Sequence, residues 1–276
     1  MEVIKMEYQL IALDMDGTLL NKDFQITKGC QEAIGKALQL GKVVSISTGR
    51  SLTEMKPYLQ NLKGVRYLIL ESGAVVYDLK EEKILFQKTF KTSDVHKIYQ
   101  AFLKQDMMMH IFINGYSYAT KEHMYQMDKY QMGKYQKTFV LNNSGIENVE
   151  ETLNIHENEI EKINLYHQSP TNREKTIAFL NDLDVSKACV EISSLELSPK
   201  GIHKGIGLTH LCQQLNISLE QTIAVGDSYN DKDIMETAGL AIAMGNAIEE
   251  IKAAADVIVS DCNHDGVKEA IEKYLF

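Results

Sequence analysis

Two aspartates, Asp14 and Asp16, directly follow the apolar run of residues 8–13. The run is typical of a buried strand, and residues two apart in an extended chain point to the same side. Two carboxylates placed side by side repel each other unless a cation neutralises them. The pair therefore indicates a Mg²⁺ site beside a carboxylate that can attack an electrophile. A solvated Asp-x-Asp-Gly turn is the alternative, since Asp and Gly are common turn residues.

Two further loops carry residues suited to a phosphate group. Thr48 and Gly49 follow a β-branched run and offer a hydroxyl and an accessible backbone N–H. A second acidic loop, residues 226–231, follows the run 222–225, and Lys204 offers a cation just before it. Lys200 also precedes a glycine and competes with Lys204, which we favour because it opens an amphipathic helical pattern. Parallel sheets bind ligands at the carboxyl ends of their strands, so the shared position strengthens each assignment.

Strand and helix patterns alternate at both ends of the chain, which predicts an α/β fold with a parallel sheet and right-handed crossovers. The expected strands are residues 8–13, 43–48, 67–70, 222–225, 240–244 and 257–259, with a hairpin at 75–77 and 84–86. The middle of the chain instead shows short strands (110–113, 162–167 and 188–192) and helices (93–104, 144–153 and 172–182). We therefore predict a core of residues 1–86 and 193–276, interrupted by an inserted α+β domain of residues 87–192.

The composition limits the partners that this chain can have. Its 29 Lys and Arg against 38 Asp and Glu give a net charge of −9, which argues against nucleic acid or an anionic membrane surface. No apolar run approaches the ~18 residues of a membrane span, and residues 1–7 show no secretory leader. Four well-separated cysteines suggest reduced thiols and a cytoplasmic protein. The sequence specifies no oligomeric state.

These motifs together resemble those of the haloacid dehalogenase (HAD) superfamily. The resemblance rests on four motifs in the family's order, which are Asp14-x-Asp16-Gly17-Thr18, Thr48-Gly49-Arg50, Lys204-Gly205 and Gly226-Asp227-Ser228-x-Asn230-Asp231. Residues 73–77, 243–247 and 263–267 are similar to the Cof-type sugar-phosphatase branch, which carries a type IIB cap. The resemblance implies a Rossmann-like core with an inserted α+β cap. The chain departs from this branch at Ser72, where the branch usually has Asn before Gly-Ala.

The resemblance implies a role for each matched residue. Asp14 would be the nucleophile that forms an aspartyl phosphate, and Asp16 the general acid and base. Mg²⁺ would be held by Asp14, Asp16 and Asp227, with Asp16 contributing at most through its backbone or indirectly. The phosphoryl group would be bound by Met15, Thr48, Gly49, Lys204 and Asn230. Asp231 would support the metal or orient Lys204, with a plain helix N-terminal acid as its alternative, and Arg50 is either a phosphate ligand or a surface charge.

The leading interpretation is a Mg²⁺-dependent phosphomonoesterase acting on small phosphorylated metabolites, whether sugar phosphates, nucleotides or cofactor phosphates. A phosphomutase on the same fold and a non-catalytic phospho-ligand sensor are the alternatives. A mutase usually needs a basic cap surface to hold a bisphosphate, whereas Arg173 is the only arginine after Arg66. The Met- and Tyr-rich residues 123–135 either line a substrate pocket or form the small core of the inserted domain, and we favour the core.

Overall fold

The computed structural model describes residues 7–276, so the predicted absence of a leader falls partly on residues 1–6, outside the described part. The main sheet has the strands β1 (Leu10–Leu13), β2 (Val43–Ser47), β3 (Tyr67–Leu70), β4 (Val75–Asp78), β5 (Lys83–Gln87), β12 (Thr222–Gly226), β13 (Leu240–Ala243) and β14 (Val257–Ile258). Their order across the sheet is β14-β13-β12-β1-β2-β3-β4-β5. All four residues of β1 are buried, as its apolar run predicts for a central strand.

Parallel pairing runs from β14 to β3, and the predicted hairpin adds β4 antiparallel to β3. In β1, Leu10 is paired with Thr222 of β12 on one side and with Val43 of β2 on the other. The chain adds strands in one direction from β1 to β3 and in the other from β12 to β14. The sheet order therefore reverses beside β1, and the parallel α/β core predicted from the sequence is confirmed.

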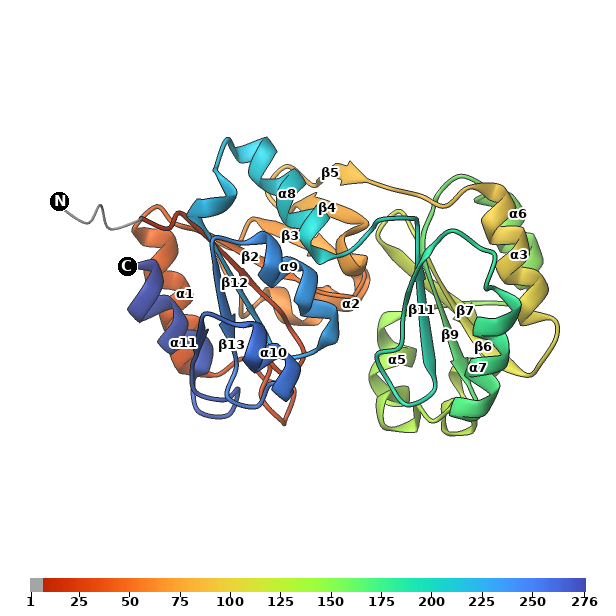
Figure 1. Cartoon of the computed structure of the whole chain (residues 1–276). Coiled ribbons are helices and arrows are strands. Elements are labelled where there is room, and N and C mark those ends of the chain that lie inside the picture. The colour runs from red at the N-terminus through yellow and green to blue at the C-terminus, as the bar shows by residue number, and fades with distance from the viewer. Residues whose placement is uncertain (1–6) are drawn as a thin grey trace. The chain divides into compact units, whose positions relative to one another are not determined.

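Helices cover this sheet (Figure 1). They are α1 (Lys28–Gln39), α2 (Leu52–Leu59), α8 (Lys204–Leu215), α9 (Lys232–Thr237), α10 (Glu249–Ala254) and α11 (Gly266–Ala270), the last continuing into a π-helical turn, Ile271–Leu275. Thr27 caps α1, and its side chain accepts a hydrogen bond from the N–H of Cys30. Helix α1 packs against α11, and α8 packs against α9. Within the described residues, no helix is long and apolar enough to cross a membrane.

Contacts within the chain divide it into two compact units. The first unit consists of the described residues up to Gly49, Lys56–Phe86 and His203–Phe276, and the second of Arg50–Met55 and Gln87–Ile202. An α+β unit thus interrupts an α/β unit. The domain limits predicted from the sequence, at residues 86 and 192, stay predictions.

The second unit is built on a six-stranded sheet with the order β10-β11-β9-β6-β7-β8. These strands are β6 (Met107–Ile113), β7 (Tyr116–Thr120), β8 (Ser144–Ile146), β9 (Ile160–His167), β10 (Ser186–Ala188) and β11 (Ser194–Ser198). Its helices are α3 (Thr92–Phe102), α4 (Lys121–Met124), α5 (Gln136–Asn142), α6 (Val149–Ile155) and α7 (Pro170–Phe179).

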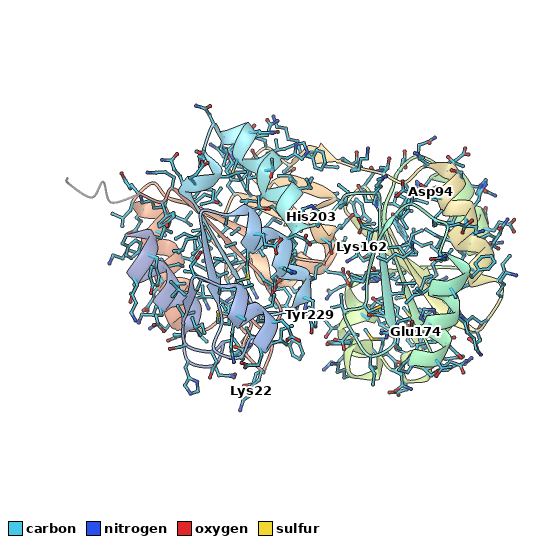
Figure 2. All side chains as sticks on the ribbon, in the orientation of Figure 1. Lys22, Asp94, Lys162, Glu174, His203 and Tyr229 are labelled. Carbon is cyan, nitrogen blue, oxygen red and sulfur yellow. The ribbon has the colours of Figure 1, made fainter. Side chains whose placement is uncertain are left out.

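Side chains that alternate along strand β6 point to opposite faces of the second unit's sheet and pack into two separate apolar clusters. Met107 and Met109 of β6 join one cluster with residues of α3 and α6, whereas Met108 joins the other. That other cluster contains Met124, Met127, Tyr130 and Met132. The Met- and Tyr-rich segment therefore contributes to the core of this unit, as favoured from the sequence. Lys162 of β9 (Figure 2) is buried, and its ammonium lies 2.6 Å from the carboxylate of Glu196.

Two elements of the second unit differ from the prediction. The strand expected over 188–192 is wrong, because β10 ends at Ala188, and Val190 and Ile192 are exposed. The following strand, β11, was not predicted although Leu195 and Leu197 alternate with polar residues. The helix expected over 144–153 is also wrong at its start, since residues 144–146 form β8 and α6 begins at Val149.

Candidate active site

Asp14 is the first residue after β1, at the centre of the main sheet. Its N–H donates to the carbonyl of Val225 in β12 at 3.0 Å, so the pairing of the two strands extends to this residue. Its side chain is nearly buried, with only 6% of the residue exposed. The carboxylate therefore lies where the strand order reverses, which is the ligand-binding point of open α/β sheets.

Lys204 is the first residue of α8, and its side chain is completely buried. Its ammonium lies 2.5 Å from Oδ1 of Asp14 and 2.6 Å from Oδ1 of Asp231. One cation thus joins two carboxylates that come from different loops of the first unit. Lys200 is instead exposed and forms an ion pair with Asp184 at 2.6 Å. The choice of Lys204 over Lys200 agrees with these positions.

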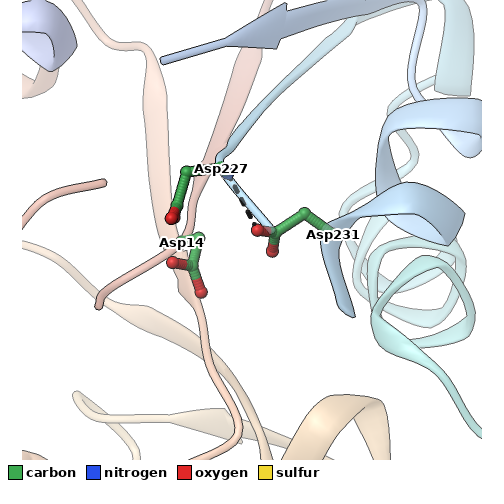
Figure 3. Close-up of side chains that lie close together, drawn as sticks. All are labelled: Asp14, Asp227 and Asp231. Atoms are coloured by element: carbon green, nitrogen blue, oxygen red, sulfur yellow. Dashed lines mark hydrogen bonds between the residues drawn. The ribbon is translucent and has the colours of Figure 1, made fainter. Parts of the chain in front are cut away.

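The loop after β12 brings a second and a third carboxylate to this point. Oδ2 of Asp231 accepts hydrogen bonds from the N–H groups of Asp227 and Ser228, both at 3.0 Å (Figure 3). Asp227 accepts a hydrogen bond from the hydroxyl of Thr18 at 2.9 Å. Carboxylate oxygens of Asp14, Asp227 and Asp231 lie within 4.8 Å of one another. We call these three residues the acidic cluster.

Burial and mutual repulsion perturb the acidic cluster. Burial raises the pKa of the Asp14 carboxyl well above its usual range, and the nearby charge of Asp231 adds to this. Burial also raises the pKa of Asp227 to about 6, again with a contribution from Asp231. For Lys204, burial alone would lower the pKa, but Asp14 and Asp231 outweigh it and raise the pKa. The ammonium therefore stays charged and stabilises the carboxylates that contact it.

The acidic cluster suits a divalent cation. When all four groups are ionised, Lys204 leaves two negative charges of the cluster uncompensated. Both oxygens of Asp231 already accept hydrogen bonds, whereas Asp14 and Asp227 offer further carboxylate oxygens. Oxygen donors of this kind are the ligands that Mg²⁺ prefers. The residues present therefore fit the metal, with Asp231 in a supporting position.

Asp16 is not part of the acidic cluster and lies in the turn that follows β1, although its charge contributes to the raised pKa of Asp227. Its side chain is exposed, unlike that of Asp14. The turn closes through the N–H of Leu20, which donates to the carbonyl of Met15 at 2.8 Å. Gly17 has a φ of +85°, and a Cβ atom at this position would lie 2.4 Å from Oδ2 of Asp227. The turn thus packs directly against the acidic cluster and presents Asp16 toward solvent.

The other residues assigned to phosphate binding lie in the first unit. Thr48 is buried and Gly49 partly buried, immediately after β2, which neighbours β1. The side chain of Met15 is buried in the core, so a ligand could be contacted only by its backbone. Oδ1 of Asn230, in the loop of the acidic cluster, accepts a hydrogen bond from the hydroxyl of Ser228 at 2.6 Å. Contacts place Arg50, by contrast, in the second unit.

The loop after β3 supports Lys204 in a way that sequence reasoning missed. Three consecutive residues have left-handed backbone conformations: Glu71 (φ +54°), Ser72 (φ +59°) and Gly73 (φ +98°). A Cβ atom on Gly73 would lie 2.2 Å from the carbonyl oxygen of His203, the residue before Lys204. Runs of left-handed non-glycine residues are rare and occur where surrounding structure holds them. The only sequence signal was the Ser-Gly pair after a strand.

One protein family has a sequence profile that matches this chain. The family is described as haloacid dehalogenase-like hydrolase, and the match covers residues 11–271. It therefore includes every residue of the acidic cluster, Lys204, and the whole of the second unit.

Curated relatives and solved structures match over nearly full length. Phosphatase YwpJ of Bacillus subtilis is 28% identical, covering 97% of this chain and 100% of that protein. The 5-amino-6-(5-phospho-D-ribitylamino)uracil phosphatase YcsE of Bacillus subtilis is 27% identical, covering 98% of this chain and 96% of that protein. A crystal structure of a haloacid dehalogenase-like hydrolase from Bacteroides thetaiotaomicron has a TM-score of 0.83 at 25% identity, covering 97% of this chain and 99% of that one.

Proposed function

Because the chain belongs to the haloacid dehalogenase-like hydrolases, in their Cof-type branch, we propose that it hydrolyses phosphate monoesters of small metabolites with the aid of Mg²⁺. It is a phosphatase of this family. The observation that carries the proposal is the contact of Lys204 with Asp14, inside a cluster of three carboxylates. A buried carboxylate held by a buried cation, at the reversal point of a parallel sheet, is suited to attack on a phosphoryl group.

Asp14 is the proposed nucleophile. One of its carboxylate oxygens attacks phosphorus as the bond between phosphorus and the ester oxygen breaks, which gives an aspartyl phosphate. Lys204 holds Oδ1 of Asp14 and so orients the carboxylate. Asp16 donates a proton to the departing ester oxygen and later takes a proton from the water that hydrolyses the aspartyl phosphate. Its exposed position in the adjacent turn is compatible with contact to both a leaving group and water.

Asp14 and Asp227 would hold Mg²⁺ through carboxylate oxygens, and Asp16 through its backbone. When bound, the metal neutralises charge on the phosphoryl oxygens and on the cluster. Backbone groups of Met15 and Gly49 and the side chains of Thr48, Lys204 and Asn230 are proposed to bind the phosphoryl oxygens. These residues come from the loops after β1, β2 and β12 and from the start of α8.

The substrate is proposed to be a small phosphorylated metabolite of the cytoplasm. The relative YcsE is named for a ribityl phosphate, which has an alkyl leaving group. The net charge of −9 disfavours nucleic acid as a substrate. The four cysteines are free in the described chain, which supports a reducing compartment.

A panel of metabolite phosphates, assayed for phosphate release, tests this function. We expect release that requires Mg²⁺ and stops with chelator, and Asp14→Asn should keep less than a few per cent of the rate while the far-UV spectrum is unchanged. Asp23→Asn, which removes an exposed carboxylate from the same loop, should keep full activity.

Ca²⁺ should inhibit phosphate release, because its longer bonds and higher coordination number disturb the orientation of the Asp14 carboxylate. Substantial turnover by Asp14→Asn or in chelator would refute the mechanism, and an isomerised product without free phosphate would indicate a mutase.

A further inference from the structure

The side chain of Asn246 connects three loops of the first unit. Its Nδ2 donates to the carbonyl oxygen of Gly17 at 2.8 Å, in the turn after β1. Its Oδ1 accepts a hydrogen bond from the N–H of Cys262 at 2.9 Å, in the loop after β14. Asn246 itself follows β13. This one exposed amide therefore joins the turn after β1, which carries Asp16, to the loops that follow β13 and β14. In the sheet, β13 and β14 lie on the other side of β12 from β1.

These two bonds match the two ends of an amide at position 246. A backbone N–H can only donate and a backbone carbonyl can only accept, so the side chain must present an acceptor to Cys262 and a donor to Gly17. The two hydrogen bonds also identify which terminal atom of the Asn246 side chain is Oδ1 and which is Nδ2. Aspartate would place an acceptor against the Gly17 carbonyl, and an apolar residue would leave both backbone groups without this partner.

The bond to the Gly17 carbonyl acts on the Gly17–Thr18 peptide, one residue beyond Asp16. Gly17 has a left-handed φ of +85°, and its Cα packs so closely on Asp227 that a Cβ would not fit. The next residue, Thr18, donates its hydroxyl to Asp227. A rotation of this peptide would change ψ of Gly17 and φ of Thr18. It would therefore alter the path of the turn on the Asp16 side and the position of the Thr18 hydroxyl. The Asp16 side chain is short, so the backbone of the turn sets the direction in which its carboxylate leaves the chain.

We propose that Asn246 is a positioning residue for Asp16. By holding the Gly17 carbonyl, it aims the Asp16 carboxyl at the ester oxygen, to which Asp16 gives its proton while the bond from phosphorus to that oxygen breaks and the bond to Asp14 forms. The inference rests on the proposed function, in which Asp16 is the general acid. A displacement of about 1 Å in a catalytic group can reduce the rate about 100-fold, so the loss of one orienting bond is measurable.

The test compares two kinds of leaving group. An alkyl phosphate needs a proton on its departing oxygen, whereas p-nitrophenyl phosphate leaves as a stable anion and needs little acid catalysis. The quantity to compare is kcat/KM, because it does not include the later hydrolysis of the aspartyl phosphate. For the alkyl phosphate, Asn246→Ala should lower kcat/KM by about 10- to 100-fold. It should lose less than about 3-fold on the aryl phosphate.

Asn263→Ala is the matched control. Asn263 is exposed, follows Cys262 in the same loop, and accepts a hydrogen bond from the N–H of Lys22 at 3.1 Å. Lys22, labelled in Figure 2, lies beyond the turn, so this bond joins the same loops without touching Gly17. The ratio of aryl to alkyl kcat/KM should be that of the wild type in Asn263→Ala and should rise only in Asn246→Ala.

A double variant separates positioning from a general structural effect. Asp16→Ala with Asn246→Ala should react with the alkyl phosphate no more slowly than Asp16→Ala alone, since both changes remove the same proton transfer. An equal loss on both substrates in Asn246→Ala, or a further loss in the double variant, would overturn the inference while leaving the phosphatase assignment intact. If Asp16→Ala itself lowered kcat/KM equally on both substrates, the acid role of Asp16 in the proposed function would be wrong. The inference about Asn246 would then be wrong as well.

Discussion

Lys204 is the residue on which the acidic cluster depends most. It is completely buried, so its ammonium is stabilised by Asp14 and Asp231 in place of water. An ion pair inside a protein contributes little against a well-packed apolar pair, but removal of one partner leaves a buried charge unpaired. The same contact that would orient the proposed nucleophile, Asp14, therefore also keeps a buried charge paired in the fold.

Lys204→Met should lower both activity and stability. We expect a loss of phosphate release of at least 100-fold and a destabilisation of about 3–5 kcal/mol, because Asp14 and Asp231 lose their cation. Lys200→Met is the matched control: Lys200 also precedes a glycine but is exposed and pairs with Asp184. It should change the free energy of unfolding by only about 0–1 kcal/mol. Urea unfolding and phosphate release measure both, and similar losses in the two variants would contradict the role of Lys204.

The sequence singles out every residue of the acidic cluster but does not reveal the direction of the Asp16 side chain. Asp14, Asp227 and Lys204 are recognisable because each stands at the end of a strand or the start of a helix. The spacing of Asp14 and Asp16 suggests that they face one spot, as in an extended chain. In the structure the chain turns after Asp14, so Asp16 is exposed and Asp231 joins the cluster instead. A turn changes side-chain direction at each residue, which spacing alone does not reveal.

Among the elements, the left-handed loop after β3 has the largest local effect. Gly73 has both a positive φ and a close approach to His203, so a side chain there must displace the start of α8. Gly41, at the end of α1, has a similar φ of +79° with nothing within 4 Å of a Cβ. A comparison of alanine substitutions at these two glycines therefore separates the effect of backbone strain from that of steric displacement.

Gly73→Ala should be worse than Gly41→Ala in both stability and activity. Gly41→Ala should be destabilised by about 1–2 kcal/mol, the usual cost of a left-handed conformation, with full activity. Gly73→Ala should lose more stability than this and at least about 10-fold in kcat, because it shifts Lys204. Ser72→Asn should instead stabilise the protein by up to about 1 kcal/mol, since Asn tolerates this conformation better. Thermal unfolding and kinetics test all three, and equal behaviour of the two alanine variants would argue against steric displacement.

An ion pair that responds to pH joins Arg66, which precedes β3, to Asp78 at the end of β4. Two nitrogens of the Arg66 guanidinium donate to Asp78 at 2.9 and 2.7 Å, and the N–H groups of Lys80 and Glu81 donate to the same carboxylate. The hydrogen bonds from Arg66, chiefly, lower the pKa of Asp78 to about 2. The folded protein therefore binds this proton more weakly than the unfolded chain, whose Asp has a pKa of about 3.9.

Stability from this pair should be present above about pH 4 and should be lost as the pH falls toward about 2. The shift corresponds to about 1–2 kcal/mol once reduced for solvent screening, since 37% of the Arg66 side chain is exposed. Urea unfolding of the wild type and Asp78→Asn should differ by this amount at pH 6, with the difference shrinking below pH 4. A difference that stayed constant from pH 6 to pH 2.5 would refute this linkage.

Patterns in the sequence predict the main sheet better than the second unit. The central strands are continuous apolar runs that are buried on both faces, as β1 and β12 show. In the second unit, the apolar letters of residues 188–192 suggest a strand, yet Val190 and Ile192 are exposed. The true strand, β11, carries Ser and Glu on alternate positions and few β-branched residues. Pairing with β9 stabilises it, and such long-range pairing overrides local propensity.

Considering the whole molecule, every residue proposed to touch the phosphoryl group or the metal belongs to the first unit. These residues would contact only the phosphoryl group and the metal, so they cannot distinguish one phosphate monoester from another. The second unit has its own sheet and its own apolar clusters, so we predict that it supplies the contacts that distinguish one leaving group from another.

Replacing residues 87–202 with a flexible linker of about eight residues should raise KM and reduce the preference among metabolites. p-Nitrophenyl phosphate should be affected much less, because it draws little binding energy from the missing unit. The ring of Phe86 stacks on that of His210 in α8, so a short linker can join the cut ends. Far-UV spectra and thermal unfolding must first show that the shortened chain folds. An unchanged ranking of natural substrates would place specificity in loops of the first unit, Ser72 first among them.

The discontinuous first unit has a consequence for synthesis on the ribosome. Thr18 and Asp227, which hold the acidic cluster together, are separated by 209 positions in the chain, and β1 has β12 as one of its two neighbours. At about 5–20 residues per second, one edge of β1 waits about 10–40 s for its partner strand to be made. The second unit lies between them in the chain and can fold during this interval. Until then, the apolar β1 exposes one open strand edge, so we expect nascent chains to need protection from chaperones until β12 has been translated.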